Sequence, residues 1–104
     1  MEIVVFVTTK NISQAKKISQ ALLSKKLAAC VNIFSGVQSF FWWQGKVDSA
    51  REGLLIIKST KDRFPKLVQC VKALHSYQVP EIIALPIVAG NKEYLQWLKA
   101  SCRS

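Results

Sequence analysis

The chain contains a single histidine, His75, and its surroundings offer the clearest metal chemistry in the sequence. Tyr77 follows two residues later and Glu81 six residues later. An imidazole nitrogen is a good ligand for Cu(II) and Zn(II), and a neighbouring carboxylate can orient the ring or join the metal. A histidine at the C-terminal end of a helix can instead interact with the last carbonyl groups and the helix dipole. Both roles, metal ligand and helix-terminal residue, are therefore open for His75.

The other reactive side chains are three cysteines, Cys30, Cys70 and Cys102. They are odd in number and far apart, which favours buried free thiols over disulfides or a zinc site. Cys70 lies five positions before His75 on one predicted helix, about 140° around its axis, so the two do not share a face. The sequence also has no glycine-rich phosphate loop. We therefore expect no catalytic activity and no required cofactor.

Four consecutive aromatic residues, Phe40, Phe41, Trp42 and Trp43, precede a tight turn at Gln44-Gly45. In a strand, consecutive side chains alternate between the two faces of the sheet. If helices cover one face only, the other leaves large rings in water, and monomers rarely expose such a patch. The pattern favours burial of these rings in a subunit interface. A monomeric core and a ligand platform are the alternatives.

Hydrophobic periodicity predicts four extended segments and three helices. The extended segments are residues 3–8, 27–34 continuing at 37–43, 46–58 and 82–88, and the helices are 11–26, 64–75 and 94–102. Asn11 and Gln14 have the spacing of a capping box. Asp62 is the expected N-cap of the second helix, with Pro65 in its first turn, and a β-bulge is expected at residues 51–53.

This order of elements is β-α-β-β-α-β followed by a terminal helix. With both longer helices on one face of the sheet, it predicts an α+β, ferredoxin-like sandwich with a long hairpin. The chain has 104 residues and no linker or repeat, so residues 1–104 are expected to form a single domain.

The net charge of +9 suggests either a solvated surface or an acidic partner such as nucleic acid. RNA-recognition domains with this strand order stack bases on the first and third strands, and the third extended segment, 46–58, has no aromatic residue. RNA binding is therefore the less favoured function. No apolar run approaches the ~18 residues of a membrane span, and the N-terminal run is too short for a signal peptide. We expect a cytoplasmic protein that does not insert into membranes.

Several separated motifs in register resemble the CutA family of divalent-cation tolerance proteins. They are residues 28–32 (AACVN), 39–46 (SFFWWQGK), Glu52, 55–58 (LIIK), 75–82 (HSYQVPEI) and 94–98 (YLQWL). The resemblance runs from Ile3 to the terminal helix. It implies a homotrimer similar in architecture to PII signalling proteins, with a role in tolerance of divalent metals, notably copper, and no agreed catalytic activity.

The resemblance also implies which polar residues matter. Glu52, Lys58, Tyr77 and Glu81 match polar positions that the family retains, so they are expected either as structural partners, including a Glu–Lys pair, or as a ligand cleft between subunits. Phe40, Phe41, Trp42 and Trp43 are expected in the trimer interface.

The chain also departs from the family pattern. Phe41 replaces a frequent tyrosine, Gln44 a turn acid, and Ser76 a proline. Copper-binding members share a Cys and a His-His pair, and the matching positions here are Val7, Leu74 and His75, so only His75 is retained. Any copper binding is therefore expected to be weak.

Overall fold

The computed structural model describes residues 1–103, which fold as four strands, three α-helices and one 3-10 turn. In chain order these are β1 (Glu2–Thr9), α1 (Ile12–Ser24), β2 (Cys30–Trp43), β3 (Lys46–Thr60), the 3-10 turn η1 (Lys61–Arg63), α2 (Phe64–Leu74), β4 (Ile82–Pro86) and α3 (Lys92–Ser101). The α+β class and the order of the elements agree with the sequence-based prediction. None of the helices described within residues 1–103 has the length and apolar content needed to span a membrane.

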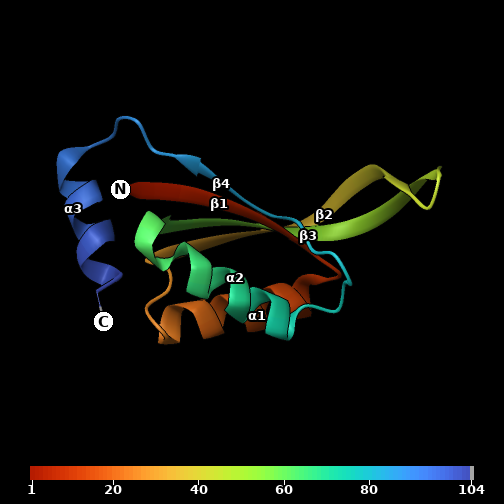
Figure 1. The fold of residues 1–104 in the computed structure, drawn as a ribbon, viewed down its shortest axis with the longest axis horizontal. Helices are drawn as coiled ribbons and strands as arrows, with labels where there is room; N and C mark the ends of the chain where they lie inside the picture. The colour runs from red at the N-terminus through yellow and green to blue at the C-terminus, as the bar shows by residue number, and fades with distance from the viewer. Residues whose placement is uncertain (104) are drawn as a thin grey trace.

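The strands form one antiparallel sheet in the order β2-β3-β1-β4. Helices α1 and α2 cover one face of this sheet, and α3 lies at the end away from the hairpin (Figure 1). The hairpin of β2 and β3 extends beyond the two covering helices, so the molecule measures 44 × 26 × 22 Å. The site described below lies where this hairpin leaves the covered part of the sheet.

The core lies between the sheet and the two covering helices. Alternate residues of β1 and β3 face the helices and are fully buried, as Val5 and Val7 are opposite Ile57 and Leu55. Leu22 of α1 and Leu67 of α2, both fully buried, complete this layer. The opposite face of the sheet, called here the open face, carries the other half of each strand's residues.

The predicted cap of α1 is confirmed. The Asn11 side chain accepts a hydrogen bond from the Gln14 backbone N–H at 2.8 Å, and the Gln14 side chain accepts one from the Lys10 N–H at 3.0 Å. The predicted cap of α2 is wrong. Arg63 occupies the N-cap position, and Asp62 lies in the preceding 3-10 turn, where a hydrogen bond with the Thr60 side chain lowers the pKa of its carboxyl.

The β-bulge also differs from the prediction. β2 pairs with β3 continuously except between Phe34 and Val37, which oppose Leu54 and Glu52. The extra residue therefore belongs to β2, opposite Gly53, and not to residues 51–53 of β3. Gly36 takes a φ of +70°, which an L-residue rarely adopts, and this explains why the irregularity lies at the glycine of β2.

Candidate functional site

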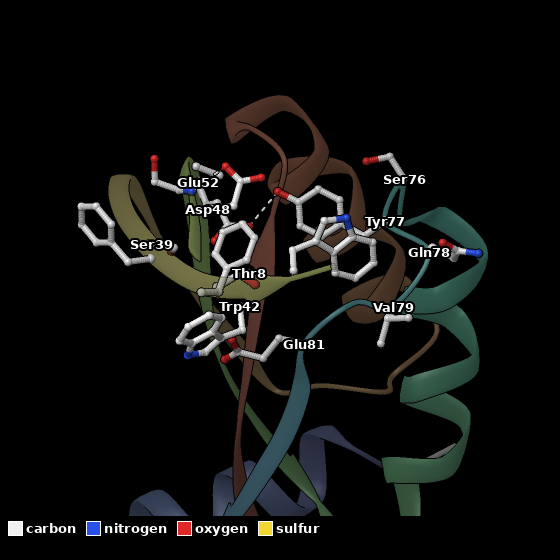
Figure 2. A pocket seen from close by; sticks show the side chains of 15 residues that line it. Thr8, Ser39, Trp42, Asp48, Glu52, Ser76, Tyr77, Gln78, Val79 and Glu81 are labelled. Carbon is white, nitrogen blue, oxygen red and sulfur yellow. Dashed lines mark hydrogen bonds between the residues drawn. The ribbon is translucent and has the colours of Figure 1, made fainter. Parts of the chain in front are cut away.

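A cavity of about 890 Å³ lies between the hairpin and residues of the segment 75–81, which joins α2 to β4 (Figure 2). Its walls carry five aromatic rings, those of residues 40–43 and Tyr77. Three carboxylates, Asp48, Glu52 and Glu81, also line it. The cavity thus combines a large apolar surface with a few acidic groups.

A hydrogen bond between Glu52 and Tyr77 forms the polar centre of the cavity. The Tyr77 hydroxyl donates to Glu52 Oε2 at 2.7 Å, linking β3 to the segment after α2 (Figure 2). Glu52 is only 7% exposed although it lies on the open face of the sheet. Burial, together with the hydrogen bond to Glu52 and its charge, raises the pKa of Tyr77 to about 12. Tyr77 is therefore a neutral donor at physiological pH.

His75 fixes the start of the same segment. The backbone N–H of Tyr77 donates to Nδ1 of His75 at 3.1 Å, so Nδ1 must be the unprotonated nitrogen. Nε2 then carries the proton and donates a hydrogen bond to the carbonyl oxygen of Thr8 at 2.7 Å. Both ring nitrogens are thus engaged with backbone groups, and this tautomer follows from the hydrogen-bond network. A metal at His75 would have to displace one of these bonds.

The described part of the single chain does not gather the side chains of a metal centre. Within residues 1–103, no group of three or more His, Cys, Asp or Glu side chains is placed to hold a metal ion. The three cysteines are free thiols, as predicted; Cys70 and Cys102 are buried, and Cys30 is partly buried. Burial raises the pKa of the Cys102 thiol, which disfavours the thiolate that a metal would need.

The structure brings together three of the four predicted cleft residues. Glu52, Tyr77 and Glu81 line one cavity, with Glu81 exposed at its edge. Lys58 lies six residues further along β3, where its ammonium group contacts the side-chain oxygen of Asn32. The two residues of the expected Glu–Lys pair therefore do not meet within one chain, because six residues of an extended strand span roughly 20 Å.

Sequence reasoning missed Asp48 as a lining residue. Asp48 pairs with Phe41 across the hairpin, so both side chains point to the same face. The two-residue Gln44-Gly45 turn fixes this register, and counting back from the turn would have placed Asp48 beside the aromatic run.

The aromatic residues of the hairpin are exposed in the single chain. Phe40 and Trp42 are 74% and 76% exposed, while Phe41 and Trp43 on the other side are 38% and 44% exposed. This confirms the expected alternation and shows that these rings do not belong to the core of the monomer. Their exposure on both sides follows from the extension of the hairpin beyond α1 and α2.

Comparison with known proteins gives consistent matches. The model of the family described as CutA1 divalent ion tolerance protein matches residues 3–101. The divalent-cation tolerance protein CutA of Thermus thermophilus is 52% identical over 99 residues, covering 95% of this chain and 96% of that protein. The chloroplastic protein CutA 1 of rice is 52% identical over 101 residues, but the matched region is 57% of its length.

Solved structures agree with the sequence matches. The Thermus thermophilus Cut A1 structure superposes with a TM-score of 0.96 at 51% identity, covering 97% of this chain and 98% of that one. The Archaeoglobus fulgidus structure, described as a periplasmic divalent cation tolerance protein CutA, gives 0.96 at 43% identity, with 99% and 100% covered. Relatives are thus described as chloroplastic or periplasmic, and the predicted cytoplasmic location stays a prediction.

Proposed function

Because the chain belongs to the CutA1 divalent ion tolerance family, we propose that it is a homotrimeric binding and regulatory module. In this proposal it serves tolerance of divalent metals, copper in particular, without catalysing a reaction. Its fold is the ferredoxin-like sandwich, three copies of which assemble in the manner of PII proteins. Its place of action is the cytoplasm.

The observation that carries the proposal is the amount of apolar surface the single chain leaves in water. On the open face, Phe34, Ile83 and Leu85 are each more than half exposed, and Phe40 and Trp42 on the hairpin are about three-quarters exposed. Phe40 and Trp42 lie on the other side of the hairpin, so both sides expose apolar surface. Large exposed apolar surfaces are uncommon on a monomer and typical of a subunit interface. An isolated two-stranded ribbon is also marginally stable in water, so contact with neighbouring chains would support the hairpin.

Sedimentation of the purified protein tests the assembly. The expected mass is about 35 kDa, three times the 11.7 kDa of the chain. Replacing Trp42 and Trp43 together by serine should dissociate or misfold the trimer, because two large desolvated rings contribute several kcal/mol. A matched control replaces Lys16 and Lys17, which are exposed on α1, by serine and should remain trimeric. A mass of about 12 kDa at micromolar concentration would contradict the proposal.

The metal role is tested separately in a host that lacks its own copy of the gene. Expression of the chain should restore growth at inhibitory Cu(II) concentrations, and the dissociated tryptophan variant should not. Since the single chain offers no cluster of metal ligands within its described residues, we propose that tolerance does not depend on a tight resident ion. Elemental analysis of the native protein should therefore find less than one bound metal ion per chain.

A second candidate function is favoured by the cavity itself. Its volume of about 890 Å³ is within the usual range of small-ligand sites, roughly 300–1,000 Å³. Glu52 and Tyr77 supply a fixed polar pair beside aromatic walls. In this alternative the chain is a PII-like signalling module whose cleft between subunits takes a small molecule.

A further inference from the structure

We propose that the outer face of helices α1 and α2 binds the phosphate backbone of nucleic acid without reading its sequence. This inference goes beyond the proposed function and uses neither the cavity nor the open face of the sheet. The surface, called here the basic helix face, is defined by exposed lysines of the two helices and of the end of α1: Lys16, Lys17, Lys25, Lys26, Lys66 and Lys72.

Nearly all of the net charge of the chain lies in the two segments that form this face. Residues 10–26 and 61–75 hold nine basic residues and one acidic residue, a net charge of +8. The rest of the chain holds six basic and five acidic residues, a net charge of +1. A surface that mixes both signs is enough for solubility. A layer of one sign produces a field that attracts a polyanion.

The lysines of the basic helix face have no acidic residue beside them on either helix. Neither α1 nor α2 contains an aspartate or a glutamate. Asp62, the one acid of the two segments, precedes α2 in the 3-10 turn, where its carboxyl makes a hydrogen bond with the Thr60 side chain. Like charges gathered on one surface repel one another. Phosphate groups bound along the face would relieve this repulsion.

The two helices present one continuous surface. They lie side by side on the same face of the sheet (Figure 1), and the Lys25 ammonium group at the end of α1 lies 4.0 Å from Sγ of Cys70 in α2. Cys70 follows Lys66 by one helical turn, so lysines of both helices come close together. The 13 residues of α1 span about 20 Å. Duplex DNA carries one charge per about 1.7 Å, so a short segment can contact several of these lysines at once.

The basic helix face lies outside the contacts of the proposed trimer. In that assembly the chains meet through the open face and the hairpin. Helices α1 and α2 cover the opposite face of the sheet (Figure 1). The charge and the exposure of their outer side therefore do not depend on the neighbouring chains.

The side chains of this face favour contacts with phosphate over contacts with bases or insertion into a membrane. Lysine is a flexible point charge, and phosphate contacts carry no sequence information. Phe64 is the only Phe, Tyr or Trp in the two segments, and it packs against the core, so no such ring is offered to a base. The apolar sides of the helices face the sheet, where Leu22 and Leu67 are fully buried and cannot enter a bilayer. The expected mode is therefore electrostatic binding of the backbone.

Fluorescence anisotropy of a labelled DNA duplex of about 20 base pairs tests the inference. At 3.4 Å per pair the duplex is about 68 Å long, which exceeds the 44 Å of the chain. At physiological salt we expect a dissociation constant of about 1–100 µM, equal for AT-rich and GC-rich duplexes. If about four lysines contact phosphates, the affinity should fall roughly a hundredfold between about 50 and 200 mM salt. No binding at the lower salt, an affinity independent of salt, or a strong sequence preference would overturn the inference.

Two variants of equal net charge locate the binding surface. The test variant replaces three lysines of the basic helix face: Lys16→Gln, Lys17→Gln and Lys72→Gln. The control variant removes the same charge from exposed positions in the C-terminal region: Lys92→Gln, Lys99→Gln and Arg103→Gln. The test variant should bind at least about tenfold more weakly, with a shallower salt dependence, and the control less than about threefold more weakly. Equal losses in the two variants would show attraction by net charge alone and overturn the inference.

Further measurements cover folding, membranes and assembly. If circular dichroism shows that the test variant is unfolded, the other lysines of the face are replaced, with the same loss expected: Lys25→Gln, Lys26→Gln and Lys66→Gln. Vesicles that contain phosphatidylserine are compared with the duplex at equal phosphate concentration, and tighter binding to the vesicles would overturn the inference in favour of a membrane surface. Sedimentation of the same samples reports on assembly, so a trimer that does not bind DNA refutes this inference alone.

Discussion

Replacing Tyr77 by phenylalanine removes one oxygen atom and leaves the buried Glu52 carboxylate without its described donor. The hydrogen bond measures 2.7 Å and its acceptor is charged and 7% exposed. Hydrogen bonds to charged groups contribute about 1.5–3 kcal/mol to stability. Because the substitution leaves a buried carboxylate without this hydrogen bond, its desolvation is no longer compensated. We expect Tyr77→Phe to lower the free energy of unfolding at pH 7 by about 2 kcal/mol.

The contribution of the Glu52–Tyr77 pair to the free energy of unfolding depends on pH, and the sign of this dependence follows from the pKa of Tyr77. Burial in first place, and then the hydrogen bond to Glu52 and its charge, raise this pKa from 10.0 to about 12. A raised pKa means that folding favours the protonated phenol. The stabilisation is therefore complete below pH 10 and is lost as the pH rises from 10 to about 12. Two units correspond to at most ~2.7 kcal/mol, and the partial exposure of the ring reduces this to ~1–2 kcal/mol.

The assay is denaturant unfolding of the intact chain and of Tyr77→Phe between pH 7 and 12. The difference between the two proteins should be largest below pH 10 and shrink towards pH 12. Tyr94→Phe is the matched control, because burial also raises the pKa of Tyr94 but its ring packs at a tilt against Trp97, with 44° between the ring planes. A loss below about 0.5 kcal/mol for Tyr77→Phe at pH 7, the scatter of surface substitutions, would refute the reasoning. A difference that grows above pH 10 would refute it as well.

Three other predictions concern separate parts of the chain. Gly53→Ala would place a Cβ 2.7 Å from the Thr9 side-chain oxygen, so thermal unfolding should show a loss of about 1–3 kcal/mol. Asn11→Ala removes the cap that accepts from the Gln14 N–H, and the same measurement should show a loss of about 1 kcal/mol. Calorimetric titration should find Cu(II) binding that is micromolar or weaker, because both ring nitrogens of His75 already make backbone hydrogen bonds; nanomolar binding that His75→Ala abolishes would contradict this.

The regular elements could be predicted from the sequence because their signals are local. The Asn11 and Gln14 spacing gave the start of α1, and the alternation of β1 gave its buried face. The errors arose where tertiary structure decides. Asp62 is a suitable N-cap by type, but the 3-10 turn continues directly into α2 and shifts the cap to Arg63. Gly53 resembled a bulge residue, whereas it is the close approach of its backbone to Thr9 that requires a glycine.

The site was predictable only in part, because its members come from distant parts of the chain. The motif around Tyr77 and Glu81 suggested polar residues near Glu52, and the structure brings these three together. Lys58 was expected in the same group, but it lies six residues beyond Glu52 along the extended strand β3, outside the cavity lining. His75 looked like a ligand because it is the only imidazole, yet its short contacts to backbone groups give it a structural role in the single chain.

The placement of charge explains how a strongly basic chain could associate with copies of itself. Residues 10–26 and 61–75, which include α1 and α2, hold nine basic residues and one acidic residue, a net charge of +8 out of +9. These helices cover one face of the sheet, and the open face is on the side away from them (Figure 1). Repulsion between like charges falls off within about 8–10 Å at physiological salt. If the proposed chains meet through the open face and the hairpin, their positive helix layers would therefore stay outward, and solubility and self-association would use opposite sides of the same sheet.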